Sequence, residues 1–301
     1  MRWLSRASVL LLAISTLTAA RAEAEIVLLD DSGQRLVFTQ PVRRIVTLAP
    51  HLAEQVFDVG AGDYLVGTVE WSNKPAAARD VPRIGDSFRV DAERIVALQP
   101  DVVLAWGGGT PQNTIERLRA LDLQVAVLAP ENLASIPQHM RWLGALTGNG
   151  AQAEKASRAF SEGLARLRQE YADHEPVRVF YQISSQPIFT VGAGHTISEL
   201  IDLCGARNIF SDLDARAHPV SREAVLGRDP EVIVAGRYAG SEDELAGWHR
   251  WEDLTATRAG NLLSIDAETV ARPTIGILAG GRELCEALDS ARRNLRVTND
   301  S

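Results

Sequence analysis

The chain has 301 residues, of which 46% are hydrophobic and 23% are charged, a balance typical of an ordinary globular protein. Its formal net charge of −8 argues against a nucleic-acid partner, because binding phosphates requires a basic surface. Beyond residue 24 no run approaches 18 consecutive apolar residues, so no membrane-spanning helix is expected there.

The first 24 residues have the pattern of a signal peptide. Arg2 and Arg6 give a positive start, a mostly apolar run follows at 9–19, and residues 20–24 contain two overlapping A-x-A cleavage motifs. The alternative is an uncleaved membrane anchor. No cysteine lies near the cleavage point, so a lipid anchor is not expected. We therefore expect residues 1–24 to be removed and the mature protein to be soluble in the periplasm.

The remaining chain, about 277 residues, is long enough for two domains. Nearly continuous apolar runs predict parallel strands that are covered on both faces. These runs lie at residues 44–48, 102–105, 125–128, 177–182, 232–235 and 262–265. Helical patterns lie between them at residues 51–59, 92–98, 113–120, 196–203 and 222–226. The alternation predicts an α/β fold with mostly parallel sheets flanked by helices.

Residues 151–171 form a long helical pattern in which Gly163 is the one glycine. A helix of this length spans roughly 30 Å, so we expect it to link two lobes. The alternative is an ordinary crossover helix inside one domain. The predicted organisation is an N-terminal lobe at 25–149, a linker helix at 150–173 and a C-terminal lobe at 174–301.

The chain also repeats itself across this helix. Residues 91–105 resemble residues 221–235 at a constant offset of 130. In each copy an Asp or Ser is placed to cap a short helix, and an acid, Glu93 or Glu223, lies in the first turn, where it favours the helix dipole. A proline then leads into a buried strand. The repeat predicts two lobes of similar plan.

A second, weaker repeat supports the same conclusion. Glu54 is followed six residues later by Gly60 and an alanine, and Glu199 is followed in the same way by Gly205 and an alanine. Together the two repeats indicate a pseudo-twofold relation between the lobes.

The two cysteines are Cys204 and Cys285. In an oxidising compartment such a pair is most simply interpreted as one disulfide, which would stabilise the fold by about 4 kcal/mol. The alternative is two separate buried thiols. Neither cysteine has a Cys or His nearby at ligand spacing, so no metal site is predicted.

Motifs of catalysis are missing from the sequence: it has no G-x-S-x-G, no H-E-x-x-H and no P-loop. Residues 191–195 are only weakly similar to a dinucleotide-binding turn. Residues 107–109 are three glycines after a strand, which fits either a flexible turn or close approach of the backbone to a ligand. We predict no catalytic residues and no enzyme activity.

Aromatic residues follow several of the predicted strands or lie in nearby loops, where open α/β sheets bind ligands. They are Trp71, Phe88, Trp106 and Phe189. Such side chains favour a flat, apolar or conjugated ligand, and the alternative is core packing. Trp248 and Trp251 lie in a polar stretch and are expected to have a structural role.

Three histidines occupy positions near predicted element ends: His51, His195 and His218. A histidine there could ligate a metal centre carried by a ligand. The more ordinary interpretation, which we favour, is a hydrogen-bonded or solvated side chain.

Five segments carry a resemblance to a known family. They are residues 44–54, 93–106, 177–182, 220–223 and 283–285. On these residues the chain resembles the helix-linked periplasmic binding proteins for cobalamin, haem and siderophores, and among them the cobalamin-binding proteins, from about residue 44 to 295. Cys204 and Cys285 also look like the disulfide pair of that family.

The resemblance implies how the protein meets its partner. In such proteins a surface glutamate on each lobe docks to arginines of the importer's membrane subunits, and Glu93 and Glu223 match those positions. Exposed ion pairs are individually weak, so these residues are expected to orient docking more than to supply its affinity.

The resemblance also implies a ligand site between the lobes. Trp71, Trp106 and Phe189 match family aromatics, and Glu268 with Arg272 matches an acidic and basic pair that touches the polar edge of the ligand. Two departures occur. One family tryptophan falls at Ser87, with Phe88 as its replacement, and another falls at Ala217 or His218.

Our hypothesis is therefore a monomeric periplasmic solute-binding protein of an ABC importer. It would bind cobalamin or a related corrinoid between its lobes, without a cofactor or catalysis. One alternative is the same fold carrying haem or a ferric siderophore. Another is a metal-dependent enzyme on a chelatase-like scaffold, for which His51, His195 and His218 would have to cluster around a metal.

Overall fold

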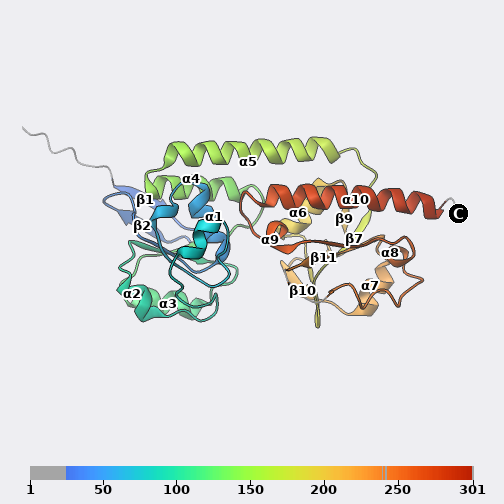
Figure 1. Cartoon of the computed structure of the whole chain (residues 1–301), viewed down its shortest axis with the longest axis horizontal. Helices are drawn as coiled ribbons and strands as arrows, with labels where there is room; N and C mark the ends of the chain where they lie inside the picture. The colour runs from blue at the N-terminus through green and yellow to red at the C-terminus, as the bar shows by residue number, and fades with distance from the viewer. Residues whose placement is uncertain (1–24, 239, 241–242, 300–301) are drawn as a thin grey trace, which may run out of the picture.

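The computed structural model describes residues 25–238, 240 and 243–299 of the chain. The predicted signal peptide, residues 1–24, lies outside the described residues. Two α/β lobes lie side by side, and helix α5 (Gly150–Tyr171) extends along one side of both (Figure 1). None of the helices in the described part is long and apolar enough to cross a membrane.

The N-terminal lobe is built on a four-stranded parallel sheet with the order β4-β3-β5-β6. Its strands are β3 (Ile45–Thr47), β4 (Leu65–Thr68), β5 (Val102–Trp106) and β6 (Val125–Leu128). Its helices are α1 (Pro50–Asp58), α2 (Ala92–Ala97), α3 (Gln112–Ala120) and α4 (Ser135–Thr147), with short 3-10 turns at Gly62–Tyr64 and Ala76–Asp80. A hairpin of β1 (Ile26–Leu29) and β2 (Arg35–Phe38) precedes them.

The C-terminal lobe contains a larger, mixed sheet with the order β10-β8-β7-β11-β12, and β9 pairs with β7. Its strands are β7 (Arg178–Ser185), β8 (Ile188–Val191), β9 (Arg207–Asn208), β10 (Ala217–Pro219), β11 (Val232–Arg237) and β12 (Leu262–Asp266). Its helices are α6 (Thr196–Leu203), α7 (Arg222–Arg228), α8 (Thr255–Arg258), α9 (Ala267–Val270) and α10 (Ile277–Asn299). β8 and β10 are antiparallel to their neighbours, whereas the others run parallel.

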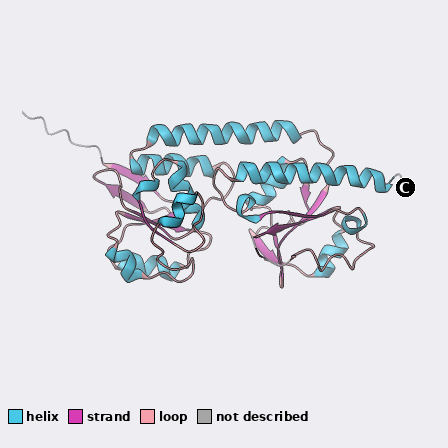
Figure 2. Cartoon of the chain, viewed as in Figure 1, coloured by secondary structure: helices cyan, strands magenta, loops and turns pink. Residues whose placement is uncertain are grey.

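The hydrophobic core continues through both lobes beneath the long helices. One buried cluster extends from Ile45 of β3 through Phe160 of α5 to Leu284 of α10. Helix α5 packs on α4 and on α10, and a Cβ at Gly163 would come within 2.7 Å of the Leu278 side chain. Figure 2 shows the main sheets of both lobes on the same side of this helical layer. The predicted α/β fold, with two lobes joined by one long helix, is confirmed.

The structure explains the stronger repeat. Asp91 caps α2 by accepting a hydrogen bond from the Arg94 backbone nitrogen at 3.0 Å. Ser221 caps α7 in the same way, accepting from the backbone nitrogen of Ala224 at 3.1 Å. Each short helix leads into a buried parallel strand, β5 or β11. The two segments therefore form the same structural unit in the two lobes.

The predicted disulfide is present. Cys204, at the end of α6, is bonded to Cys285 in α10, and both residues are fully buried. Arg292 of α10 donates to the carbonyl oxygen of Cys204 at 2.8 Å. The bridge thus fixes the last helix of the chain to the body of the C-terminal lobe.

Candidate functional site

The segments that follow the carboxyl ends of the parallel strands meet between the lobes. From the N-terminal lobe these are α1 after β3, residues 69–75 after β4 and residues 130–133 after β6. From the C-terminal lobe they include α9 and residues 271–276, which follow β12. Ligands of open α/β sheets bind outside the carboxyl ends of strands, so this junction is the candidate site.

An ion pair between Glu54 of α1 and Arg272 joins the lobes at this junction. Thr274 donates to the second carboxylate oxygen of Glu54 at 3.2 Å, and Gln55 donates to the Pro273 carbonyl oxygen at 2.6 Å. The side chains of Arg272 and Glu54 are only 14% and 10% exposed. Removing either side chain would leave the charge of the other shielded from water without its counter-charge, which destabilises the fold.

Arg272 also connects to the predicted ligand residues. Its Nη2 atom lies 3.4 Å from the Trp71 carbonyl oxygen and 3.4 Å from a carboxylate oxygen of Glu268. Lys74 forms a further ion pair with Glu268 across the lobes at 3.1 Å. The structure therefore brings Trp71, Glu268 and Arg272 together, and Trp71 remains 72% exposed beside them.

A second contact between the lobes lies on the loop after β6. Glu199 of α6 accepts a hydrogen bond from the Leu133 backbone nitrogen at 3.0 Å. Arg216 donates to the carbonyl oxygens of Pro130 and Glu131 at 3.0 and 3.3 Å. Sequence reasoning missed these contacts, as it missed Gln55 and Lys74.

The weaker repeat had paired Glu54 with Glu199, and both reach the opposite lobe. Each lies on the helix that ends just before a glycine with positive φ, Gly60 at 73° or Gly205 at 67°. A residue with a side chain is strained in that conformation, which explains why both copies keep glycine. The weaker repeat was thus the one signal in the sequence that pointed to the two glutamates that join the lobes.

Trp106 lies at the end of β5, half-buried, with its ring edge-on to the buried His51 at 5.2 Å between ring centroids. The three glycines that follow pack against it. A Cβ at Gly109 would lie 2.1 Å from the Trp106 ring, and one at Gly107 would lie 2.7 Å from Ala129. These glycines are therefore required by the packing of the Trp106 ring and of its loop.

The other two predicted aromatics lie on different elements. Phe88 is 73% exposed in the loop before α2 and borders a hollow of about 240 Å³ that Arg117 of α3 also lines. Phe189 is half-buried on β8, opposite Pro219 of β10. Trp248 is fully buried and donates to the side chain of Gln182 at 2.8 Å, in keeping with the structural role expected of it.

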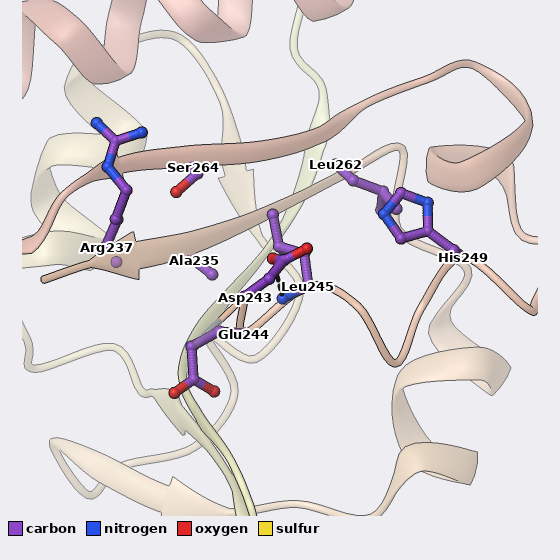
Figure 3. Close-up of a pocket in the computed structure, with 9 residues that line it drawn as sticks. Ala235, Arg237, Asp243, Glu244, Leu245, His249, Leu262 and Ser264 are labelled. Carbon is purple, nitrogen blue, oxygen red and sulfur yellow. Dashed lines mark hydrogen bonds between the residues drawn. The ribbon is translucent and has the colours of Figure 1, made fainter. Parts of the chain in front are cut away.

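The hollow shown in Figure 3 lies elsewhere in the C-terminal lobe. Its volume is about 400 Å³, and its lining comes from β11, β12 and the segment around Asp243 and His249. In Figure 3 the side chains of Arg237 and His249 lie at opposite ends of it. None of the predicted ligand residues lines this hollow.

Burial controls the charge of the ionisable groups on α1. It raises the pKa of Glu54, even though the hydrogen bond and charge of Arg272 act in the opposite direction. Burial, aided by the charge of Glu54, raises the pKa of Asp58 to about 6, although Asp58 accepts a backbone hydrogen bond from Ile275 at 3.4 Å. Burial and the charge of Arg272 lower the pKa of His51 to about 3, so its imidazole is neutral near pH 7.

Replacing Asp58 with asparagine is expected to raise the free energy of unfolding by up to about 3 kcal/mol at pH 7.5. The folded-state pKa, about 6, lies above the ordinary value of 3.8, so the wild-type protein loses stability as the pH rises from 3.8 to 6. Urea unfolding between pH 4 and pH 8 measures the difference. The advantage of the variant should vanish toward pH 4, and the exposed Asp63→Asn serves as control. A constant difference at all pH values would contradict the assignment.

The histidines do not assemble into a metal site. His195 caps α6, accepting from the Ile197 backbone nitrogen at 3.1 Å, and burial lowers its pKa to about 4. His218 lies on β10, opposite Thr190. Within residues 25–238, 240 and 243–299, no group of three or more His, Cys, Asp or Glu side chains could hold a metal ion.

The comparison with known families decides where this chain belongs. A sequence model described as "Periplasmic binding protein" matches residues 45–269. The chain belongs to the periplasmic binding protein family. This binding protein is 34% identical over 255 residues to the vitamin B12-binding protein of Vibrio parahaemolyticus, covering 84% of this chain and 92% of the relative. The vitamin B12-binding protein of Pectobacterium carotovorum is 32% identical over 249 residues, which is 82% of this chain and 88% of that one.

Solved structures agree with this assignment. The vitamin B12-binding protein BtuF of Vibrio cholerae superposes on this binding protein with a TM-score of 0.77 at 33% identity, covering 84% of this chain and 98% of that one. The haem-binding protein RhuT of Roseiflexus sp. RS-1 gives a TM-score of 0.73 at 22% identity, with 83% and 98% covered. The second similarity establishes a shared fold. The predicted resemblance to cobalamin-binding proteins is confirmed.

Proposed function

We propose that this periplasmic binding protein captures cobalamin or a related corrinoid between its lobes and delivers it to the membrane subunits of an ABC importer, without catalysing a reaction. The observation that carries the proposal is the exposed Trp71 beside Arg272 and Glu268, at the junction where strand ends of both lobes meet. The similarity to vitamin B12-binding proteins over 84% of the chain supports the choice of ligand.

The chemistry of the site suits a large ligand with an apolar face and polar edges. Trp71 offers a flat apolar surface, and Trp106 offers a second, partly exposed one. Glu268 and Arg272 supply charged hydrogen-bonding groups for amide side chains around such a ligand. Phe88 and Phe189 are proposed to widen the contact on either lobe. Burial of apolar area would supply the affinity, and the polar pair would set the orientation.

Replacing Trp71 with alanine is expected to weaken cobalamin binding by roughly 10- to 100-fold, as expected for loss of about 1.5–3 kcal/mol of apolar burial. Titration calorimetry on both proteins measures the change. Trp251→Ala is the control. It also removes a partly exposed indole, but one that lines a hollow away from the proposed ligand site, so this variant should bind cobalamin as the wild type does.

A second titration distinguishes the ligands that this fold can carry. Cobalamin, haem and a ferric siderophore are each added to the purified protein and followed by absorption spectroscopy. A response to haem or to the siderophore with none to cobalamin would replace our proposal by the corresponding alternative. An unchanged cobalamin affinity in Trp71→Ala would remove Trp71 from the site.

We also propose that Glu93 and Glu223 dock the protein to basic groups of the importer. Both are exposed in the first turns of α2 and α7, which lie on the side of the molecule away from α5 in Figure 1. Their equivalence in the repeat supports a partner with two similar subunits. Because Glu93 and Glu223 lie outside the ligand site, they can contact the importer without contacting the bound ligand.

The variant Glu93→Ala with Glu223→Ala is expected to bind the reconstituted importer about 2- to 30-fold more weakly, because each exposed ion pair contributes about 0.2–1 kcal/mol. Surface plasmon resonance with the importer in nanodiscs measures this, and ligand affinity should remain as in the wild type. Glu162→Ala, an exposed glutamate on α5, is the matched control. A loss of ligand affinity without a loss of docking would contradict the assignment.

We further propose that the protein is exported and acts outside the cytoplasm. Residues 1–24 are removed on export, and the mature protein acts in the periplasm as a monomer. The N-terminal lobe comprises residues 25–149, the linker helix 150–173 and the C-terminal lobe 174–301. Membership of the periplasmic binding protein family supports this location.

A further inference from the structure

Trp71 has an unusual backbone conformation. Its φ angle is 66°, in the left-handed region, where a bulky residue is disfavoured by contact between its Cβ and the backbone. The residue is 72% exposed, so burial of the indole does not offset this strain. Strained residues of this kind persist where the surrounding structure fixes them, and they concentrate at ligand-binding positions.

The residues on both sides of Trp71 are fixed to the N-terminal lobe. The Glu70 backbone nitrogen donates to the Gly85 carbonyl oxygen at 2.9 Å. Ser72 is buried, its hydroxyl accepts from Thr68 at 2.8 Å, and its carbonyl oxygen accepts from Arg83 at 3.0 Å. These bonds hold the chain on either side of Trp71, while the Trp71 side chain itself projects outward.

The Trp71 carbonyl oxygen is held from both lobes. It accepts from the Asn73 backbone nitrogen at 3.0 Å and, across the lobes, from Nη2 of Arg272 at 3.4 Å. The opposite nitrogen of the same guanidinium is paired with Glu54. A guanidinium is planar, so fixing one nitrogen on a carboxylate fixes the direction in which the other donates. Glu54 thereby determines how Arg272 meets the Trp71 backbone.

We propose that Glu54 is a positioning residue for the ligand: through Arg272 it adds the contact between the lobes that, together with the local bond from Asn73, holds the Trp71 backbone in its strained conformation and sets the angle of the exposed indole. The placement of the indole then depends on the contact between Glu54 and Arg272. This inference rests on the proposed function, because it gives Trp71 the role of a ligand platform.

The pseudo-twofold relation provides an internal comparison. Glu199, the counterpart of Glu54, also joins the lobes, but its partner is the backbone nitrogen of Leu133. Glu199 therefore offers a matched control: removing its charge disturbs an inter-lobe contact without acting on Arg272.

The first test needs no ligand. The protein is labelled with 5-fluorotryptophan, and the fluorine resonance of Trp71 is assigned by its loss in Trp71→Phe. We expect Glu54→Gln to shift or broaden that resonance, and Glu199→Gln to leave it unchanged. Arg272→Lys keeps the positive charge but loses the planar guanidinium with its two donating nitrogens. It should change the Trp71 resonance as Glu54→Gln does, and it replaces Glu54→Gln in the test if that variant fails to fold. An unchanged Trp71 resonance in Glu54→Gln or Arg272→Lys would overturn the proposal.

The second test is a double-mutant cycle with cobalamin. Glu54→Gln should weaken binding about tenfold in the wild-type background but by less than about twofold in Trp71→Ala, because the two residues act as one unit. Losses that simply add would show that Glu54 acts independently of Trp71. If the wild type itself binds no cobalamin, the proposed function fails, whereas the fluorine spectra still decide whether Glu54 positions Trp71.

Discussion

Replacing Arg272 with alanine should lower the free energy of unfolding by about 3–5 kcal/mol, because the carboxylate of Glu54 is left shielded from water without its partner. The two side chains are 14% and 10% exposed, and the pair joins segments of different lobes. Urea unfolding followed by circular dichroism measures the loss. Arg282→Ala is the control, because it breaks an exposed ion pair with Glu170 and should cost at most about 1 kcal/mol.

The loss in Arg272→Ala should depend on pH in a definite direction. Burial already raises the pKa of Glu54, and removal of the guanidinium takes away the strongest of the groups that lower it, leaving the hydrogen bond from Thr274 and the charge of Lys74. The folded variant therefore binds the proton of Glu54 more tightly than the unfolded chain, so its stability falls as the pH rises. The deficit relative to wild type should be smallest in acid. A deficit that grows in acid would contradict a buried Glu54 carboxylate that has lost its counter-charge.

Removing the disulfide with Cys204→Ala and Cys285→Ala should lower the free energy of unfolding by about 4 kcal/mol. The bond joins residues 81 positions apart, so its loss frees a long loop in the unfolded chain. Thermal unfolding with and without a reductant measures the effect. The reductant should destabilise the wild type by a similar amount and leave the double variant unchanged. Equal sensitivity of both proteins would show that the reductant acts elsewhere.

The parallel strands were predictable where their side chains are nearly all apolar and therefore have to be buried. Residues 125–128 are apolar throughout and form β6, buried on both faces. β10, by contrast, consists of an alanine, a histidine and a proline, and becomes a strand only through pairing with β8. Its structure depends on a neighbour elsewhere in the chain, which no local pattern could reveal. The same holds for β4, whose glycine interrupts the apolar run.

The site was predictable in part. Glu268 and Arg272 are four residues apart, and their pairing follows from that spacing together with the family resemblance. The partner of Arg272 in the other lobe, Glu54, is 218 residues away, and only the weak repeat with Glu199 had singled it out. The left-handed conformation of Trp71 was also invisible in the sequence, because tryptophan is among the residues least suited to it.

The layer of long helices has a kinetic consequence. α5 packs on α4 in one lobe and on α10 in the other, above a hydrophobic cluster that continues through both. Wide opening would expose that cluster to water, so we expect the lobes to behave as a nearly rigid frame. A rigid frame reorders little when cargo arrives, and its rate of loading depends on diffusion and fit. Differences between cargoes should then lie in how slowly each one leaves.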